Sequence, residues 1–542
     1  MDHSAMRRLK PTITVLAALS LGAPAAHAQD RPALVVLIII DQLRPDYLTR
    51  WERQFTGGFR RILRDGAHFA NGYQDHAATE TAPGHASALS GRFPVSTGIL
   101  FNSEGVNARE ASALVKYPGT GASPFRFRGT TLADWMQTSD TDTRVLSVAR
   151  KDRGAILLVG RGASHTVLWY TANAGRHTTS LWYGDTLPHW VGAFNAERGV
   201  LRLAGQRWQL LLPESAYASE DTARAARRTD SGFPKLLPGD SAAAADAIQR
   251  FPWIDSLTLA LAWRGVRAMD LGGRQAGPDL LAVSLSALDG VGHRWGPDSR
   301  EVHDAVLRLD RYVGAFIDSL YALRGAGRVI VALTSDHGVT AVPEVHSTFD
   351  DNTAAVRVPS AAFRAPLAAA RAALRSAGQD PTAVRWSSRI LWLNPERVTP
   401  GFDATPVGRA FADAASQVPG VMRAELLAAT AARDTSGDAV ARRWIRMFTP
   451  GVPAPNGDIA LATVTLEPYS FLGSGADATH GSPHDQDARV PVAFLGAPFR
   501  ASRNATKVNV VDIGPTLAAV LGIAPGERVD GRVVREAMAE GR

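Results

Sequence analysis

The sequence predicts an α/β fold with a mostly parallel central sheet, and three stretches carry that prediction. Residues 33–40, 279–285 and 328–333 are continuous, largely apolar runs rich in leucine, isoleucine and valine. A strand that is buried on both faces of a parallel sheet has this pattern, without the polar alternation of a half-exposed strand. Acidic and histidine residues follow each run, at the strand ends where open α/β sheets bind their ligands.

Helical and strand patterns between and after these runs complete the predicted core. The clearest helix covers residues 301–323, where apolar side chains recur at helical spacing and form one face. The other expected helices are 57–64, 130–138 and 513–521, and the other expected strands are 144–149 and 490–495.

The length of 542 residues is too great for one compact core. We therefore expect a catalytic domain at residues 29–542 with insertions at about 164–251 and about 345–470, which form a cap. The first insertion begins with an aromatic-rich hairpin and continues as a polar, loop-like stretch. In the second, the expected helices are 361–377 and 406–416, and the expected strands are 389–393 and 458–466.

Residues 1–28 have the pattern of a secretory signal peptide. Basic residues come first, followed by a mostly apolar run at 13–21 and an A-x-A cleavage site that ends at Ala28. The apolar run is too short for a membrane span, and no later segment approaches the roughly 20 apolar residues that a bilayer requires. The sequence thus predicts a periplasmic or secreted protein with no membrane association. The Arg7-Arg8 pair leaves twin-arginine export open.

Net charge and cysteine content limit which partners the protein can bind and which side chains can hold a metal. The signal contains three basic residues and one acidic residue, so its removal lowers the formal charge from +7 to +5. The remaining basic residues are scattered, which argues against a nucleic-acid partner and suits small anionic substrates. There are no cysteines, so any metal must be held by histidine and carboxylate side chains. We expect the protein to be a monomer.

Thr81 stands at a predicted turn into a helix. The Ala-Pro-Gly turn directly after it and the helical pattern at 85–89 place its hydroxyl at or just before the first helical turn. Free backbone N–H groups and the positive end of the helix dipole favour an anion at this place. The hydroxyl is therefore either a helix cap or a nucleophile that needs an activator, and both interpretations stay open here.

Candidate metal ligands follow the buried runs and one later loop. Parallel strands deliver their carboxyl ends to one edge of the sheet, so these residues would converge in one crevice. Each alone is equally compatible with a loop, turn or cap. Together, oxygen and nitrogen ligands without sulfur suit two zinc ions or a similar pair. The candidates are Asp41, Asp289, His293, Asp336, His337 and His480.

Two metal ions about 4 Å apart would provide the activator that Thr81 needs. One would coordinate the threonine oxygen and lower its pKa, and the other would hold the leaving-group oxygen. This arrangement serves in-line displacement at phosphorus and predicts a covalent phosphothreonine. Lys151 and Arg153 follow the strand at 144–149 and could either contact the same anion or form a solvated loop.

Six motifs resemble the alkaline phosphatase superfamily, in particular its type I phosphodiesterase/nucleotide pyrophosphatase branch and, within that branch, the phosphate-irrepressible alkaline phosphatases. They occur in the expected order over most of the chain after residue 28. The motifs are IIIDQLRPDYL, TAPGHASALSG, ARKDRGAIL, DGVGH, TSDHGV and ATHGSP.

The resemblance implies a three-layer sandwich with a capped active site, and it assigns roles to single residues. It implies that Asp289, His293 and His480 hold one zinc, and that Asp41, Asp336, His337 and the oxygen of Thr81 hold the other. It also implies that Asn102, Lys151 and Arg153 contact the non-bridging phosphate oxygens of a monoester dianion, whose extra charge a lysine and an arginine can neutralise.

Three functions follow as alternatives. The first is a two-zinc alkaline phosphatase that hydrolyses small phosphate monoesters and releases inorganic phosphate. The second is a phosphodiesterase or nucleotide pyrophosphatase with the same metals and threonine, and the third is a binding protein that has lost turnover. The sequence does not favour a sulfatase, because Thr81-Ala82-Pro83-Gly84-His85 lacks both the convertible cysteine or serine and the arginine of the sulfatase motif.

Overall fold

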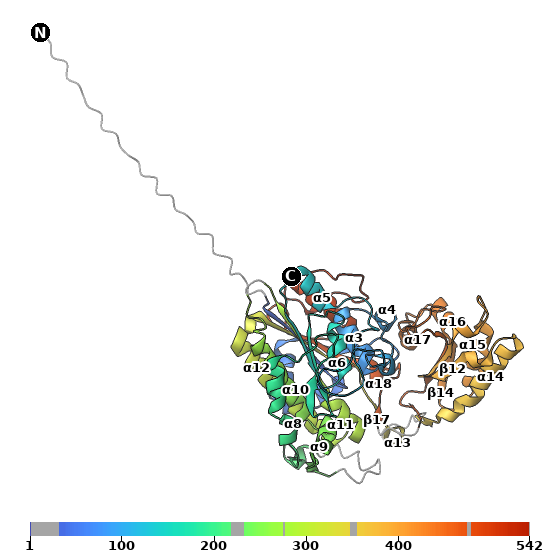
Figure 1. Cartoon of the computed structure of the whole chain (residues 1–542), viewed down its shortest axis with the longest axis horizontal. Coiled ribbons are helices and arrows are strands. Elements are labelled where there is room, and N and C mark those ends of the chain that lie inside the picture. Colours follow the sequence, from blue (N-terminus) through green and yellow to red (C-terminus); the bar gives the residue numbers. More distant parts are fainter. Residues whose placement is uncertain (2–31, 218–231, 275–276, 347–354, 474–477, 541–542) are drawn as a thin grey trace.

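The computed structural model describes Met1 and residues 32–217, 232–274, 277–346, 355–473 and 478–540 (Figure 1). Apart from Met1, the predicted signal of residues 1–28 lies outside this part of the chain. Among the described residues, no helix is both long enough and apolar enough to cross a bilayer.

A ten-stranded sheet forms the centre of the described molecule. Five neighbouring strands in the order β9-β1-β8-β3-β4 run parallel, and antiparallel strands flank them. Strand β20 (Val508–Asn509) pairs with β2 outside the main order. The main order is β19 (Ser502–Asn504), β2 (Ala67–Tyr73), β18 (Arg489–Leu495), β9 (Val329–Thr334), β1 (Leu34–Ile40), β8 (Asp279–Leu285), β3 (Val145–Ala149), β4 (Thr166–Thr171) and β5 (Arg176–Thr178).

The middle strand β1 explains the continuous apolar pattern of its sequence. All seven residues are buried, and they alternate between two hydrophobic cores on the two faces of the sheet. Val36 and Ile38 belong to one core, whereas Val35 and Leu37 belong to the other. A strand covered on both faces gains from apolar side chains at every position, so no alternation remains in the sequence.

Helices cover both faces of this sheet and complete a three-layer sandwich (Figure 1). One face carries α10 (Trp253–Ala268), α11 (Ala287–Trp295) and α12 (Arg300–Arg324). The other face carries four helices that form the second hydrophobic core with the sheet. They are α3 (Thr81–Ser90), α5 (Leu132–Ser139), α6 (Asp152–Val159) and α19 (Ile513–Leu521). The predicted fold class is confirmed.

A second, antiparallel sheet of four strands lies apart from the central one and has its own hydrophobic core (Figure 1). Helices α14 (Arg364–Ser376) and α15 (Thr405–Ala415) pack on each other, and α15 also packs on this sheet. The short helix α17 (Ala439–Ile445) lies between this sheet and the main body. The strand order is β12 (Val384–Ser387), β13 (Ile390–Leu393), β15 (Ile459–Leu466) and β14 (Val421–Leu426).

The segment before residue 251 differs from the loop-like stretch that its composition indicates. It contains α7 (His189–Ala196), α8 (Gly199–Arg202) and α9 (Ser241–Ala247), and the second strand of the predicted hairpin is only Arg176–Thr178. In α9, a run of alanine and aspartate forms a helix because alanine has the highest helix propensity and the Asp240 side chain caps its first turn through Ala243 N.

Candidate active site

The carboxyl ends of four adjacent parallel strands bring the predicted residues to one edge of the central sheet. Asp41 follows β1 directly, Lys151 stands two residues after β3, and Asp336 stands two residues after β9. Asp289 lies in the first turn of α11, the helix after β8. Because β9, β1, β8 and β3 are neighbours, residues nearly 300 positions apart in the chain meet here.

Two groups of side chains could each hold a metal ion. Asp289, His293 and His480 form one group, and Asp41, Asp289 and His337 form the other, with ligand atoms within 4.8 Å of one another in each. Asp289 belongs to both. Asp336 is adjacent to the second group, because its Oδ2 lies 3.6 Å from His337 Nε2.

Backbone carbonyls orient all three histidines in the same way. Nδ1 of His293 donates to Ala478 O at 2.8 Å, Nδ1 of His337 to Gly338 O at 2.9 Å, and Nδ1 of His480 to Thr79 O at 2.8 Å. A carbonyl only accepts, so the Nδ1 proton is fixed and each neutral ring presents the lone pair of Nε2 to the site. Second hydrogen bonds of this kind are typical of metal-binding histidines.

Several buried polar atoms of the site have no hydrogen-bond partner. They are both carboxylate oxygens of Asp41, Oδ2 of Asp336 and Nε2 of His337. Asp41 has ion pairs instead, with Lys151 Nζ at 2.5 Å and His337 Nε2 at 3.3 Å. Burial of polar atoms without partners is costly, so this donor set fits cations that take oxygen and nitrogen ligands.

The carboxylates and cations of the site shift each other's pKa values. Burial and the neighbouring Asp289 raise the pKa of Asp41, but Lys151 and His337 outweigh both and hold that pKa well below its usual range. Burial lowers the pKa of His337, yet the carboxylates of Asp336 and Asp41 raise it to about 9. The acidic residues therefore attract positive charge to this edge of the sheet.

Thr81 lies at the same place and is not a helix cap. It is the first residue of α3, after Glu80 at the N-cap position, and it is 1% exposed. Its Oγ1 accepts a hydrogen bond from Lys151 Nζ at 3.1 Å. Gly84 permits the helix to approach the loop after β9, since a Cβ there would lie 2.3 Å from Asp336 O. The first turn of α3 is thus held against the metal-ligand groups.

The three predicted phosphate contacts differ in their placement. Lys151 is 7% exposed and joins Thr81 Oγ1 to Asp289 Oδ2, which excludes a solvated loop for this residue. Asn102 Oδ1 accepts from Ala82 N at 2.8 Å, so its amide lies beside the start of α3. Arg153 lies in the first turn of α6 with its side chain 26% exposed, 3.9 Å from Asp152, and no contact described in the structure joins it to Thr81.

Two residues without a predicted role also support the site. Gln42 has a positive φ of 67° and donates from its backbone N to Asp336 Oδ1 and from Nε2 to Asp289 Oδ1. His85 places Nδ1 2.9 Å from Thr81 O and 3.3 Å from Asp336 Oδ2. Their positions in the sequence could have indicated this, because Gln42 adjoins Asp41 and His85 lies one helical turn after Thr81.

Comparisons with known proteins agree with this geometry. Residues 35–392 match the family model described as type I phosphodiesterase / nucleotide pyrophosphatase. Alkaline phosphatase PhoK of a Sphingomonas species is 31% identical over 92% of this chain and 90% of its own length. Alkaline phosphatase PafA of Elizabethkingia meningoseptica is 34% identical over 59% of this chain and 62% of its own length.

A solved structure shares the fold. The crystal structure of wild-type alkaline phosphatase PafA superposes with a TM-score of 0.81 at 24% identity, and the match covers 94% of this chain and 99% of that one. Together with the family model, which spans well over half of the sequence, these likenesses confirm the predicted family. The chain belongs to the type I phosphodiesterase / nucleotide pyrophosphatase family.

Proposed function

We propose that the protein is an alkaline phosphatase that hydrolyses small phosphate monoesters through a covalent phosphothreonine at Thr81. The observation that carries this proposal is the meeting of Thr81 Oγ1, Lys151 Nζ and two metal-ligand groups at one edge of the sheet. The names of the relatives PhoK and PafA support the phosphatase activity.

Two zinc ions are the proposed cofactors. Asp289, His293 and His480 would hold one, and Asp41, Asp336, His337 and the Thr81 oxygen would hold the other. Such a pair supplies Lewis-acid activation of the attacking and leaving oxygens. The atoms of Asp41 and His337 that have no hydrogen bond and the common orientation of the three histidines support this arrangement.

The residues of the chain supply nucleophile, orientation and charge. A bond forms between Thr81 Oγ1 and phosphorus while the bond from phosphorus to the leaving oxygen breaks, and water then releases phosphate from the threonine. Lys151 Nζ already contacts Thr81 Oγ1 and would neutralise the dianion of a monoester. Asn102 would donate its Nδ2 hydrogens to a phosphate oxygen, because its Oδ1 is fixed by Ala82 N. Arg153 is a further proposed contact.

The alternative is a phosphodiesterase or nucleotide pyrophosphatase with the same nucleophile and metals, an activity that the family description includes. A diester carries less charge and a second organic group, so it gains less from Lys151. The deciding experiment measures metal content and the kcat/KM of an aryl phosphate and its methyl diester on one purified sample. The proposal requires zinc and a preference for the monoester, and a preference for the diester would overturn it.

Export and domain organisation are also proposed. Residues 1–28 would direct the chain to the periplasm or the medium, and residues 29–542 would form one catalytic domain with insertions at about 164–251 and about 345–470 that form a cap. Arg389, in the turn between β12 and β13 of the second sheet, donates to Gly481 O beside His480, which supports a role for the second insertion near the site. Sequencing of the mature N-terminus tests export, and a first residue other than Gln29 would contradict the cleavage site.

A further inference from the structure

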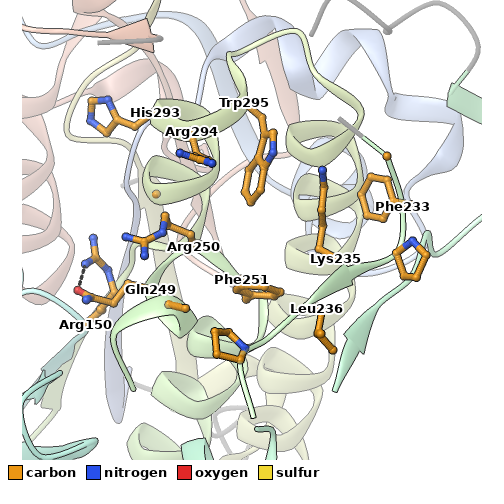
Figure 2. Close-up of a pocket in the computed structure, with 15 residues that line it drawn as sticks. Arg150, Phe233, Lys235, Leu236, Gln249, Arg250, Phe251, His293, Arg294 and Trp295 are labelled. Carbon is orange, nitrogen blue, oxygen red and sulfur yellow. Dashed lines mark hydrogen bonds between the residues drawn. The ribbon is translucent and has the colours of Figure 1, made fainter. Parts of the chain in front are cut away.

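The segments that carry Thr81 and Asn102 are packed on the region of the second sheet, residues 355–473. A cavity of about 1180 Å³ opens beside α11, with His293 in its wall, but neither Thr81 nor Asn102 lines it (Figure 2). Instead, residues just before each of them enter a hydrophobic cluster with side chains of the second-sheet region. The cluster includes Ala78, Leu100 and Phe101 on one side and Trp392, Trp444 and Phe448 on the other. The second sheet thus contributes to the packing behind the proposed nucleophile and phosphate contact.

Phe101 fixes the backbone directly before Asn102. It is 4% exposed, and its ring is roughly perpendicular to that of Trp392, with centroids 6.4 Å apart. The centroid of Phe448 also lies 6.4 Å from that of Phe101, and Trp392 and Phe448 contact each other at 5.4 Å. Buried rings in mutual contact favour specific orientations and leave little room for movement. The position of the Asn102 backbone therefore depends on the region of the second sheet.

Glu80 and Asn102 hold each other on both sides of Thr81. Glu80 Oε2 accepts from Asn102 N at 2.7 Å, and Asn102 Oδ1 accepts from Ala82 N at 2.8 Å. Glu80 is the N-cap residue of α3, but its side chain makes no capping bond within the helix and is available to Asn102 instead. Since an N–H only donates, the amide atom that faces Ala82 is the oxygen, and Asn102 Nδ2 keeps one direction.

The Glu80 carboxylate also faces a cation from the second sheet. Arg389 stands in the two-residue turn between β12 and β13 with a φ of 63°, and it donates to Gly481 O. A Cβ on Gly481 would lie 3.5 Å from Arg389 Nη2 and 3.7 Å from Glu80 Oε1, so both charged groups approach the same point. Burial lowers the pKa of Arg389, whereas the carboxylates of Glu80 and Asp487 oppose this shift. Opposite charge thus attracts the Glu80 side chain toward the second sheet while it accepts from Asn102.

We propose that Glu80 is a positioning residue for the phosphate contact Asn102 and that the region of the second sheet supports it. The inference rests on the proposed function, in which Asn102 Nδ2 donates to a phosphate oxygen while Thr81 Oγ1 bonds to phosphorus. Glu80 touches no reacting atom and acts through Asn102. A donor that is held in place before the substrate binds stabilises the transition state without reorganisation. Loss of Glu80 should therefore lower turnover although every proposed metal ligand is kept.

A double-mutant cycle separates positioning from general stability. It compares the parent with Glu80→Ala, Asn102→Ala and the double variant, and it measures kcat/KM for an aryl phosphate on samples of known zinc content. Glu80→Gln is added because glutamine keeps an acceptor for Asn102 N. The control, Glu527→Ala, removes a glutamate after α19 that likewise accepts from a backbone N–H, that of Thr130.

We expect Asn102→Ala to lower kcat/KM about 100-fold, as the loss of one preorganised donor implies. Glu80→Ala should lower it about ten-fold in the parent but no more than about two-fold in the Asn102→Ala background, because Glu80 then has no donor to position. Glu80→Gln should lose less than Glu80→Ala, and Glu527→Ala should lose no more than about two-fold. An equal loss from Glu80→Ala in both backgrounds, no loss from either single substitution, or equal losses for Glu80→Gln and Glu80→Ala would overturn the inference.

A second pair of variants tests the support from the second sheet. Phe448→Leu replaces a ring that contacts Phe101, whereas Phe411→Leu makes the same change in the separate core of the second sheet. We expect Phe448→Leu to lower kcat/KM about five-fold in the parent and not in the Asn102→Ala background. If Phe411→Leu, which urea unfolding should show to be similarly destabilised, lowers kcat/KM equally, the support is overturned. Turnover by Thr81→Ala equal to that of the parent would instead contradict the proposed function itself.

Discussion

Two buried acidic clusters of this molecule have different sets of partners. Asp41, at the end of β1, lies 2.5 Å from Lys151 Nζ and 3.3 Å from His337 Nε2, and the carboxylate of Asp289 is close enough to raise its pKa. Asp75, between β2 and α3, is 2% exposed and is surrounded by cations. Arg443 donates to it at 2.9 Å, Arg442 at 3.2 Å and Arg446 at closer range, and Lys507 lies 3.5 Å away.

This difference separates the candidate metal site from a structural ion-pair cluster. Burial raises the pKa of Asp75, but the arginines and Lys507 outweigh it and hold that pKa well below its usual range. Two of those arginines, Arg442 and Arg443, come from α17, so the cluster fastens the region of the second sheet to the segment that leads into Thr81. Around Asp41, by contrast, further carboxylates and histidines accompany Lys151, and no arginine forms an ion pair with Asp41 among the described residues. Acidic residues alone therefore do not indicate a metal site, whereas carboxylates beside histidines that are oriented by backbone carbonyls are typical of one.

The largest expected effect follows from substitution of Asp289, which both metal-ligand groups share. We expect Asp289→Asn to lower kcat/KM for a phosphate monoester by at least about 10⁴-fold, or more than 5 kcal/mol of transition-state stabilisation. Bound zinc, measured by emission spectroscopy, should fall with it. Asp75→Asn is the matched control and should keep its full zinc content. An Asp289→Asn protein with unchanged zinc content would contradict the proposal that Asp289, unlike Asp75, is a metal ligand.

The next effect concerns the stability that Asp75 provides. Asp75→Asn leaves Arg442, Arg443 and Arg446 without their common counter-charge, and removal of one partner from a buried ionic cluster costs about 3–5 kcal/mol. Urea unfolding in the presence of a chelator measures this free energy without a contribution from metal. Asp65→Asn, in an exposed pair with Arg64, serves as the control and should change little. A loss as small as that of the control would show that the Asp75 cluster does not stabilise the fold.

Lys151 should have an intermediate effect that depends on the substrate. Lys151→Ala removes the ammonium that contacts Thr81 Oγ1, and we expect kcat/KM for a monoester to fall about 100-fold, equivalent to about 2.7 kcal/mol. The diester of the same alcohol should lose much less, because it lacks the second negative charge. The measurement is kcat/KM of the parent and the variant for both substrates. A larger loss for the diester would contradict the role proposed for Lys151.

The smallest effect is expected for Asp255, a buried carboxylate whose hydrogen-bond partners are backbone N–H groups. Its Oδ1 accepts from Ser286 N and Ala287 N, and its Oδ2 has no hydrogen-bond partner. Burial raises the pKa of this carboxyl to about 7, although those N–H groups oppose the shift. The folded state therefore holds a proton that the unfolded state loses near pH 4, so this group lowers stability as pH rises from about 4 to about 7.

Asp255→Asn keeps an acceptor for both N–H groups and is neutral at every pH. We expect the free energy of unfolding of the variant to exceed that of the parent at pH 8, with no difference at pH 4. Urea titrations of both proteins with chelator present measure this difference. A variant less stable than the parent at pH 8 would show that the Asp255 carboxylate, beside Arg150, is favourable when charged.

The parallel core could be predicted from the sequence because each of its strands has a recognisable pattern within its own segment. Continuous apolar runs reveal strands that are buried on both faces, and the structure places 33–40, 279–285 and 328–333 side by side as β1, β8 and β9. The helix predicted at 513–521 has the same bounds in the structure. The helices before residue 251 were missed because a polar, alanine-rich composition also fits a loop, and only the cap at Asp240 and the packing distinguish them.

The sequence by itself determined which residues stand at strand ends, and with them Asp41, Asp289, Asp336 and His337, because parallel strands present the same end to the same edge. Only the tertiary structure decided what surrounds those residues. Gln42 reaches Asp336 across 294 positions, and Arg443 reaches Asp75 across 368. Such contacts depend on how elements pack in space, and no local pattern along the chain encodes that packing.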